Sequence, residues 1–341
     1  MICDEDFISS SLDSTPSENL VISWQTDIQP AVKHRINPNS RLWSKEIQLD
    51  ACDRFSLSTL LDFMNMIRNL SSTYVKNNCT TSSAVGVDHS FLSLPSSVCL
   101  DKSLLKLHYP LSDYGSVHDI LRQKGSGLCE KLVCAIMGRV VLCLDQLHNS
   151  GLLHRGLCSK HLLIRKILDS NPKSHKVTVV LCGLGSMAQL PPSWSTVARN
   201  DLPFLYVAWR GWRLHESSNC ESYSHPVAWY SPELLAQDFT GYSWSSDVYS
   251  LGLILYEMFT GQPPYTRCPP SLILLKKILH LDFPQLHNEI NPPSTEMQAI
   301  YEACTHYDPQ KRPSTKDLLG MSWIQQGLNT VITTGELDSL H

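Results

Sequence analysis

The sequence predicts an α+β protein of two lobes, a small strand-rich lobe followed by a larger helical one. Three observations support this. Between residues 20 and 110 the apolar residues fall in short runs broken by turn signals such as Asn37-Pro38-Asn39. After Pro110 they recur at helical spacing in long segments. The 341 residues suffice for two lobes that each bury a core.

The small lobe contains one predicted helix between strand-like segments. The patterns VISW and IQPAVKHRI within Leu20–Ile36 predict strands. Leu57–Leu70 (LSTLLDFMNMIRNL) has the spacing of an amphipathic helix, and strand-like pieces then run to Tyr109.

Two apolar segments dominate the larger lobe. Leu128–His148 predicts a core helix, and Ser246–Thr260 is apolar nearly all round, which predicts a helix buried in the middle of the lobe. Short strands are expected at Leu162–Ile164 and Val177–Leu181. We therefore divide the chain into a flexible acidic tail (1–19), a small lobe (20–110), a large lobe (111–327) and a loosely held tail (328–341).

Composition argues against several functional classes. Lys plus Arg number 28 against 32 Asp plus Glu, a net charge of -4, which predicts neither a nucleic-acid partner nor a membrane surface. The acidic N-terminus does not resemble a secretory signal, and runs such as Leu251–Tyr256 are too short to cross a bilayer. Twelve cysteines without a CxxC pair fit a reducing compartment. We expect the cytoplasm, with the nucleus also compatible.

Three motifs follow one another in the larger lobe. They are HRGLCSKHLLI from His154, SPE from Ser231 with SDVYSLG from Ser246, and DPQKRPS from Asp308. In this order they resemble the catalytic loop, the APE and DxWSxG segments, and the D-P-x-x-R-P segment of protein kinases. The resemblance implies a bilobal kinase-like fold over roughly residues 20–327.

The structural residues of this pattern are retained. The resemblance implies that Glu233 pairs with Arg312, because either charge buried alone costs about 3–5 kcal/mol. It also implies that Asp247 is the buried aspartate that accepts backbone N–H groups of the catalytic loop. His154 and Arg155 belong to the same structural set.

The chemical residues of the pattern are missing. Gly156 stands where a kinase has its catalytic-base aspartate, Cys158 where it has a phosphate-contacting lysine, and His161 where it has a metal-binding asparagine. We place Leu181 at the magnesium-binding aspartate, and the run Val180–Gly185 contains no carboxylate. These positions therefore predict no catalytic residue and no magnesium site.

Nucleotide binding is weakly supported. The first glycine of the chain is Gly86, so no glycine-rich loop precedes the strand that ends at Lys33. Ala31-Val32-Lys33 resembles the V-A-I-K strand, which makes Lys33 the candidate ATP contact. Its helix partner in kinases is a glutamate; the predicted helix has none, and Asp62 is the nearest acid. We expect no required cofactor, ATP binding without catalysis at most, and no magnesium.

Finer details resemble one kinase-like family, the STE20-related adaptors (STRAD), which are pseudokinases. The shared features are the histidine at His161, a Gly183-Leu184 pair without the metal aspartate, the Y-G-S from Tyr114, and W-x-S-P-E from Trp229. The resemblance implies an inactive adaptor that activates a kinase of the liver kinase B type together with a Mo25-type scaffold. The family's C-terminal W-E-F motif is not found in this sequence.

The segment between Gly183 and Glu233 is the expected partner-docking region, because Trp and Arg are frequent interface anchors. The partner-binding candidates in it are Trp194, Arg199, Trp209, Arg210, Trp212 and Arg213. Two alternatives stay open at this point. One is a kinase-fold adaptor for another signalling partner, and the other is a divergent, weakly active serine/threonine kinase.

Overall fold

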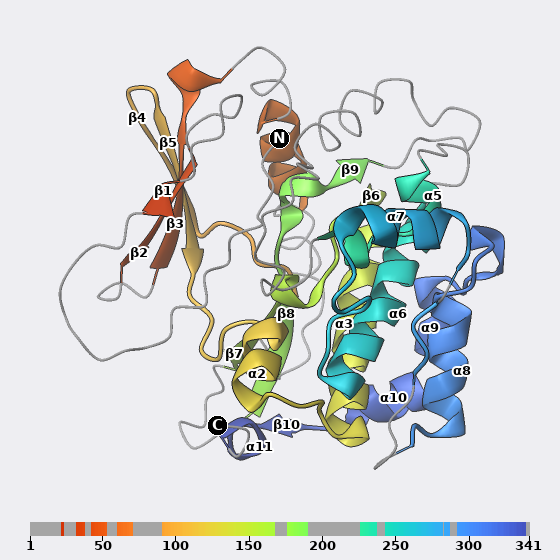
Figure 1. Cartoon of the computed structure of the whole chain (residues 1–341). Helices are drawn as coiled ribbons and strands as arrows, with labels where there is room; N and C mark the ends of the chain where they lie inside the picture. Colours follow the sequence, from red (N-terminus) through yellow and green to blue (C-terminus); the bar gives the residue numbers. More distant parts are fainter. Residues whose placement is uncertain are drawn as a thin grey trace.

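The computed structural model describes residues 22–23, 32–37, 42–52, 60–70, 91–167, 176–189, 226–236, 243–281, 283–286 and 292–338. For 22–23 and 32–37 the description covers the backbone only. A sheet lies on one side of the molecule and a group of helices on the other (Figure 1). This arrangement confirms the predicted α+β fold. The expected tail at residues 1–19 lies outside the described residues.

The small lobe is built on an antiparallel sheet whose spatial order is β1-β2-β3-β5-β4. Its strands are β1 (Ile22–Ser23), β2 (Val32–Asn37), β3 (Leu42–Gln48), β4 (Ser97–Asp101) and β5 (Leu104–Pro110). Strand β3 was not predicted from the sequence. It lies in the middle of the sheet, and its register sets Trp43 opposite Tyr109 and Lys45 opposite Leu107. β3 therefore joins β1 and β2 to β5, the strand that leads into the large lobe.

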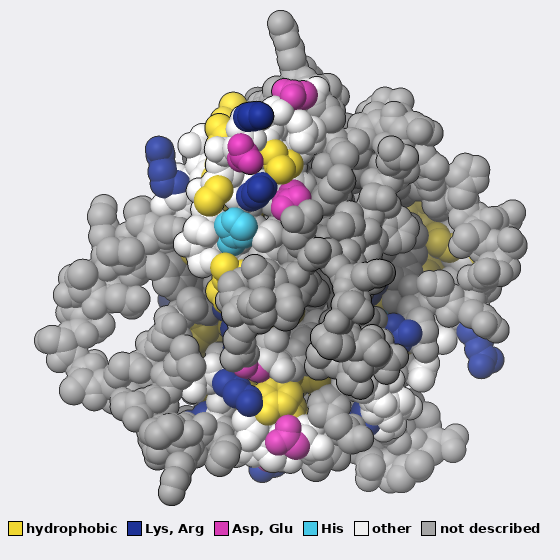
Figure 2. Space-filling view, turned by 90° about the vertical axis from the view of Figure 1, so that its left-hand side faces the viewer, with side chains coloured by type: hydrophobic (Ala, Val, Ile, Leu, Met, Phe, Trp, Pro, Cys, Tyr) yellow, Lys and Arg dark blue, Asp and Glu magenta, His cyan; other side chains and the backbone are white. Residues whose placement is uncertain are grey.

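Residues 60–70 form a helix, within the segment predicted to be helical. Its buried residues are spaced by three or four positions: Leu60, Phe63, Ile67 and Leu70. β4, at the edge of the sheet, is exposed along its whole length. In the view of Figure 2, the described surface shows hydrophobic, basic and acidic side chains side by side, without a large patch of one charge.

Two long helices form the centre of the large lobe, α3 (Glu130–Asn149) and α6 (Trp244–Thr260), close to the predicted bounds. The N-cap of α6 is Ser243, which forms a capping box, and its C-cap is Gly261, whose φ of 73° suits glycine. α3 is long and apolar enough to span a membrane, yet 67% of that apolar window is buried, in contact with α6 and other elements of the lobe. It is therefore a core helix of this lobe.

Around these two helices lie α2 (Val117–Lys124), α5 (Pro232–Leu235), α7 (Pro270–Ile278), α8 (Thr295–Cys304), α9 (Thr315–Gly320) and α10 (Ser322–Asn329). α10 packs on α3 with almost no space between the two backbones. A Cβ atom on Gly327 would lie 2.1 Å from the carbonyl oxygen of Cys134, and one on Gly138 would lie 2.8 Å from the Leu328 nitrogen. Glycine at both positions is what permits this close crossing.

The C-terminal segment differs from its prediction as a loose tail. Strands β7 (Leu162–Lys166) and β8 (Lys176–Leu181) form a hairpin, and β10 (Ile332–Thr333) pairs antiparallel with the other edge of β8. A short helix, α11 (Thr334–Asp338), follows and buries Leu337. The segment is held because the apolar side chains of Ile332 and Leu337 join the core. Two apolar residues are too few to form a periodic pattern, so the sequence did not indicate this packing.

Candidate functional site

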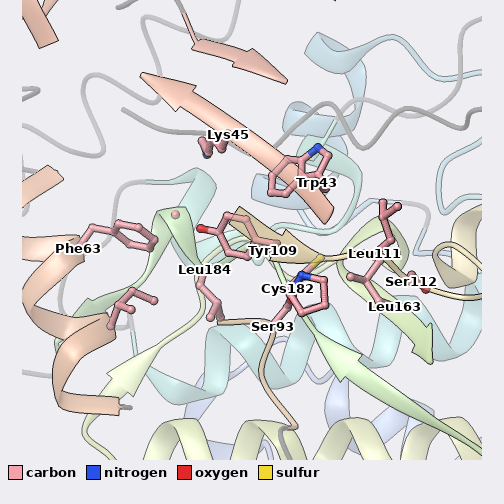
Figure 3. A pocket seen from close by; sticks show the side chains of 14 residues that line it. Trp43, Lys45, Phe63, Ser93, Tyr109, Leu111, Ser112, Leu163, Cys182 and Leu184 are labelled. Atoms are coloured by element: carbon pink, nitrogen blue, oxygen red, sulfur yellow. The ribbon is translucent and has the colours of Figure 1, made fainter. Parts of the chain in front are cut away.

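A pocket lies between the two lobes, and Figure 3 shows the side chains around it. The small lobe contributes Trp43 and Lys45 of β3, Tyr109 of β5, and Phe63 and Ile67 of the helix at 60–70. The large lobe contributes Leu163 of β7 and the turn Cys182–Gly185 after β8. This is the place where the kinase resemblance puts the nucleotide.

The pocket lysine is one that the sequence reasoning missed. Lys45 lines the pocket and is 3% exposed, whereas Lys33 lies one strand further out, on β2, where only the backbone is described. On the facing helix it is Phe63 that lines the pocket, and Asp62 is exposed. Among the described residues, this helix contributes Phe63 and Ile67, and no carboxylate, to the pocket lining.

Asp247 organises the catalytic-like loop that follows β6 (Leu152–Leu153). Its two carboxylate oxygens accept the backbone N–H groups of His154 and Arg155, each at 2.8 Å, and His148 Nε2 lies 3.0 Å away. Burial alone would raise the pKa of Asp247, but the hydrogen bonds and charges of His148 and His154 outweigh it and lower that pKa. The same contacts hold Arg155 at a φ of 63°, so Asp247 fixes the loop as the resemblance implies.

The loop itself carries no acid. His161 Nδ1 donates to the carbonyl oxygen of Gly156 at 2.6 Å and lies 3.5 Å from Cys158 Sγ. His154 is completely buried, and its Nε2 lies 2.8 Å from the Cys182 carbonyl oxygen. Gly156, Cys158 and His161 thus lie together in this loop, and the groups that they bring to it are a carbonyl, a thiol and an imidazole.

The structure changes the assignment of the metal-aspartate position. Leu181 is fully buried on β8, opposite Leu162, and points into the core rather than the pocket. Two residues later Gly183 has a φ of 77°, and a Cβ atom on it would lie 2.4 Å from Cγ of His161. Because the two metal-binding positions of a kinase must face each other, Gly183 is the residue that corresponds to the aspartate. The space of its missing side chain is filled by the imidazole of His161.

The structure also brings together the predicted pair of buried charges. Arg312 donates to both carboxylate oxygens of Glu233, at 2.7 and 3.0 Å, and to the carbonyl oxygens of Ser245, His306 and Tyr307. Ser246 Oγ donates to the same carboxylate at 2.8 Å. This network joins α5, α6 and the loop after α8, and it is satisfied at every polar group named here.

Two further buried charges, missed in the sequence, hold the segment just before Ser231. Glu257 accepts hydrogen bonds from Ser159 Oγ at 2.8 Å and from Trp229 Nε1 at 3.1 Å. Lys277 Nζ donates to the carbonyl oxygens of Ala228 and Tyr230 at 2.6 and 2.5 Å. Burial lowers the pKa of Lys277 well below its ordinary value. A charged residue inside an apolar helical run, as Glu257 in LILYEMF and Lys277 in LILLKKI, is the signal that could have identified both.

The predicted partner-binding residues lie outside the described residues. They are Trp194, Arg199, Trp209, Arg210, Trp212 and Arg213. The described anchors at Trp229 and Tyr230 fix the chain where that segment ends.

Comparison with known proteins agrees with this geometry. The protein kinase domain family matches residues 83–324, more than half of the chain. The chain is 27% identical to the mouse STE20-related kinase adapter protein beta over 261 residues, covering 64% of this chain and 56% of that protein. It is 27% identical to the Caenorhabditis elegans STE20-related kinase adapter protein strd-1 over 237 residues, covering 63% and 54%.

The matches also include kinases. Germinal center kinase 3 of Caenorhabditis elegans is 23% identical over 233 residues, covering 64% of this chain and 34% of that protein. The chain spans about half the length of the adaptor relatives that it matches. These matches confirm the resemblance to the STE20-related adaptors. The chain belongs to the protein kinase family and, within that family, is similar to the STE20-related kinase adaptors.

Proposed function

We propose that this chain is a catalytically inactive, kinase-fold adaptor that binds a partner serine/threonine kinase and activates it. One observation carries the proposal. The positions for catalysis and metal binding hold Gly156, His161 and Gly183, while the buried networks of Asp247 and of Glu233 with Arg312 are complete. Such a chain keeps the shape of a kinase without the oxygen ligands that its chemistry needs.

The magnitudes argue against useful phosphoryl transfer. Removing a general base lowers a rate by about 10²–10⁴, and removing an electrostatic element that stabilises the transition state lowers it by a further 10²–10³ or so. These losses are not simply additive. A kinase that turns over roughly ten times per second would still fall far below a useful rate.

The partner follows from the resemblance to the STE20-related adaptors. We propose a kinase of the liver kinase B type, bound together with a Mo25-type scaffold. Activation requires the adaptor to bind the active form of the partner more tightly than the inactive form. The hydrogen bonds of Trp229 to Glu257 and of Tyr230 to Lys277 support the proposal, because they fix to the large lobe the residues that follow the proposed anchors.

Reconstitution tests this proposal. The partner kinase and the scaffold are assayed with and without this chain, and phosphorylation of a peptide substrate is measured. Activity should rise only when the partner is catalytically competent. A kinase-dead partner is the control for phosphate transfer by the chain itself, and signal in that control would show that the chain is an active kinase.

Charge reversal in the docking segment gives a second readout. Arg210→Glu with Arg213→Glu should abolish activation, because both lie among the predicted interface anchors. Lys316→Glu, at an exposed position of α9, is the matched control and should leave activation unchanged. No complex and no activation by the wild-type chain would reject this partner and favour an adaptor for another one.

A further inference from the structure

Strand β4 is an edge strand with little of the protection that such strands usually have. It is last in the sheet order, after β5, and all five of its residues, Ser97–Asp101, are exposed. Figure 2 views the molecule from the side on which β4 lies. Edge strands of monomers are commonly protected by lysine, proline or an inward-pointing charge. Residues 97–100 include no charge and no proline, so the outer side of β4 is suited to pairing with another strand.

The core face of the sheet continues onto β4, where it is exposed. Val98 lies opposite Leu107 and Leu100 lies opposite Leu105, so these four side chains share one face of the sheet. Leu107 and Leu105 are 0% and 9% exposed, whereas Val98 and Leu100 are 44% and 64% exposed. Burial of the two outer side chains against a second apolar surface would therefore be favourable.

The sequence of β4 is complementary to itself when two copies run antiparallel. A twofold axis at Cys99 sets Val98 of each copy opposite Leu100 of the other, and Ser97 opposite Asp101. Apolar residues then meet apolar residues, and each carboxylate meets a hydroxyl. An axis moved to Leu100 would set Val98 opposite a lysine, at position 102. The register centred on Cys99 is therefore the one that pairs both apolar residues.

The charged groups near this edge do not oppose the pairing. Lys106 of β5 lies opposite Cys99 on one side and opposite Glu46 of β3 on the other. In the twofold pair the two Lys106 residues are three strand spacings apart, about 14 Å. The two Asp101 residues are four positions apart along the strand direction, about 13 Å. Both separations exceed the Debye length of about 8 Å at physiological ionic strength, so the repulsion is largely screened.

We propose that β4 pairs antiparallel with β4 of a second copy of this chain, about an axis at Cys99, and joins the two small lobes through one continuous sheet. Backbone hydrogen bonds supply affinity, and Val98 and Leu100 supply the apolar contact. Two five-residue strands form a contact at the low end of interface sizes, so the dimer is weak and reversible. This dimer does not depend on the partner kinase proposed above.

Sedimentation equilibrium of the full chain measures the dimer directly. The wild-type chain should show a reversible monomer–dimer equilibrium below about 200 μM. Leu100→Lys sets a charge opposite Val98 of the second copy and should weaken dimerisation by about tenfold or more. Leu275→Lys, at a position of α7 that is 50% exposed, is the matched control and should leave dimerisation unchanged. Both positions are exposed, so neither change should prevent folding.

Disulfide trapping tests the register. Chains with Val98→Cys and with Leu100→Cys, both in a Cys99→Ser background, are mixed and oxidised with diamide, which takes up the two thiol hydrogens. The mixture should give a disulfide between positions 98 and 100, identified by mass spectrometry. Either chain alone should give about tenfold less disulfide at its new cysteine, because the two copies of one position lie about 7–8 Å apart on the diagonal, too far for a disulfide.

Three results would overturn the proposal. One is a wild-type chain that stays monomeric up to about 200 μM. Another is equal trapping in the mixture and in the separate chains. The third is a monomeric chain whose capture of the scaffold or the partner kinase is lost in Leu100→Lys, which would assign this edge to that protein instead of a second copy.

Discussion

Gly183 and His161 provide the sharpest test of whether the imidazole fills the place of the metal-binding aspartate of kinases. Gly183→Ala adds a single Cβ atom at a φ of 77°, 2.4 Å from Cγ of the His161 ring. The left-handed backbone conformation costs alanine about 1–2 kcal/mol. The ring must also move by about 1 Å to reach ordinary contact distance, and overpacking of this kind costs about 1–3 kcal/mol. We therefore expect a total loss of about 2–5 kcal/mol in the free energy of unfolding.

The two costs separate in a double-mutant cycle. In a His161→Ala background the ring is gone, so Gly183→Ala should cost only the backbone share of about 1–2 kcal/mol. The coupling free energy should then be about 1–3 kcal/mol, measured by equilibrium urea denaturation of all four proteins. Equal losses in both backgrounds, within about 0.5 kcal/mol, would refute the idea that the imidazole fills the aspartate's place.

Three further predictions concern buried charges and thiols. Arg312→Met should destabilise the chain by about 3–5 kcal/mol in urea denaturation, because Glu233 stays buried without its partner, and adding Glu233→Gln should recover part of the loss. The folded pKa of Asp247 lies below its ordinary 3.8, so its contribution is present above that pH and lost as pH falls through the folded value; Asp247→Asn should flatten this acid dependence. Burial raises the pKa of Cys143 and Cys304 to about 12, so iodoacetamide at pH 8 should label the exposed Cys99 and Cys129 by mass spectrometry and spare the buried pair until denaturant is added.

Apolar periodicity predicted the two long helices well because their apolar residues are the ones that are buried. The predicted segments at 128–148 and 246–260 match α3 and α6 to within two residues at each end. β3 was missed for the opposite reason. Its four buried residues, Ser44 to Ile47, include Lys45 and Glu46, so the strand has neither alternation nor an apolar run.

The site could be predicted by residue type more readily than by register. The absence of a carboxylate between Val180 and Gly185 was evident from the sequence. The choice of Leu181 over Gly183 was not decidable there, because an apolar run offers no charged residue to align. The backbone conformation of Gly183 and its contact with His161 settle it. Likewise Glu257 and Lys277 have partners 98 and 49 residues away, at Ser159 and Ala228, which no local pattern encodes.

The pairing of β10 with β8 bears on how binding regions should be mapped. Ile332 lies opposite Val177, and Leu337 is 1% exposed. A chain shortened to residue 329 would therefore lose an edge strand and part of a core, so failure of such a fragment to capture a partner would report a damaged lobe rather than a lost contact. Substitution at an outward-facing position of the same stretch, such as Val331 at 49% exposure, keeps the sheet intact. It therefore tests whether this surface contacts a partner without damaging the lobe.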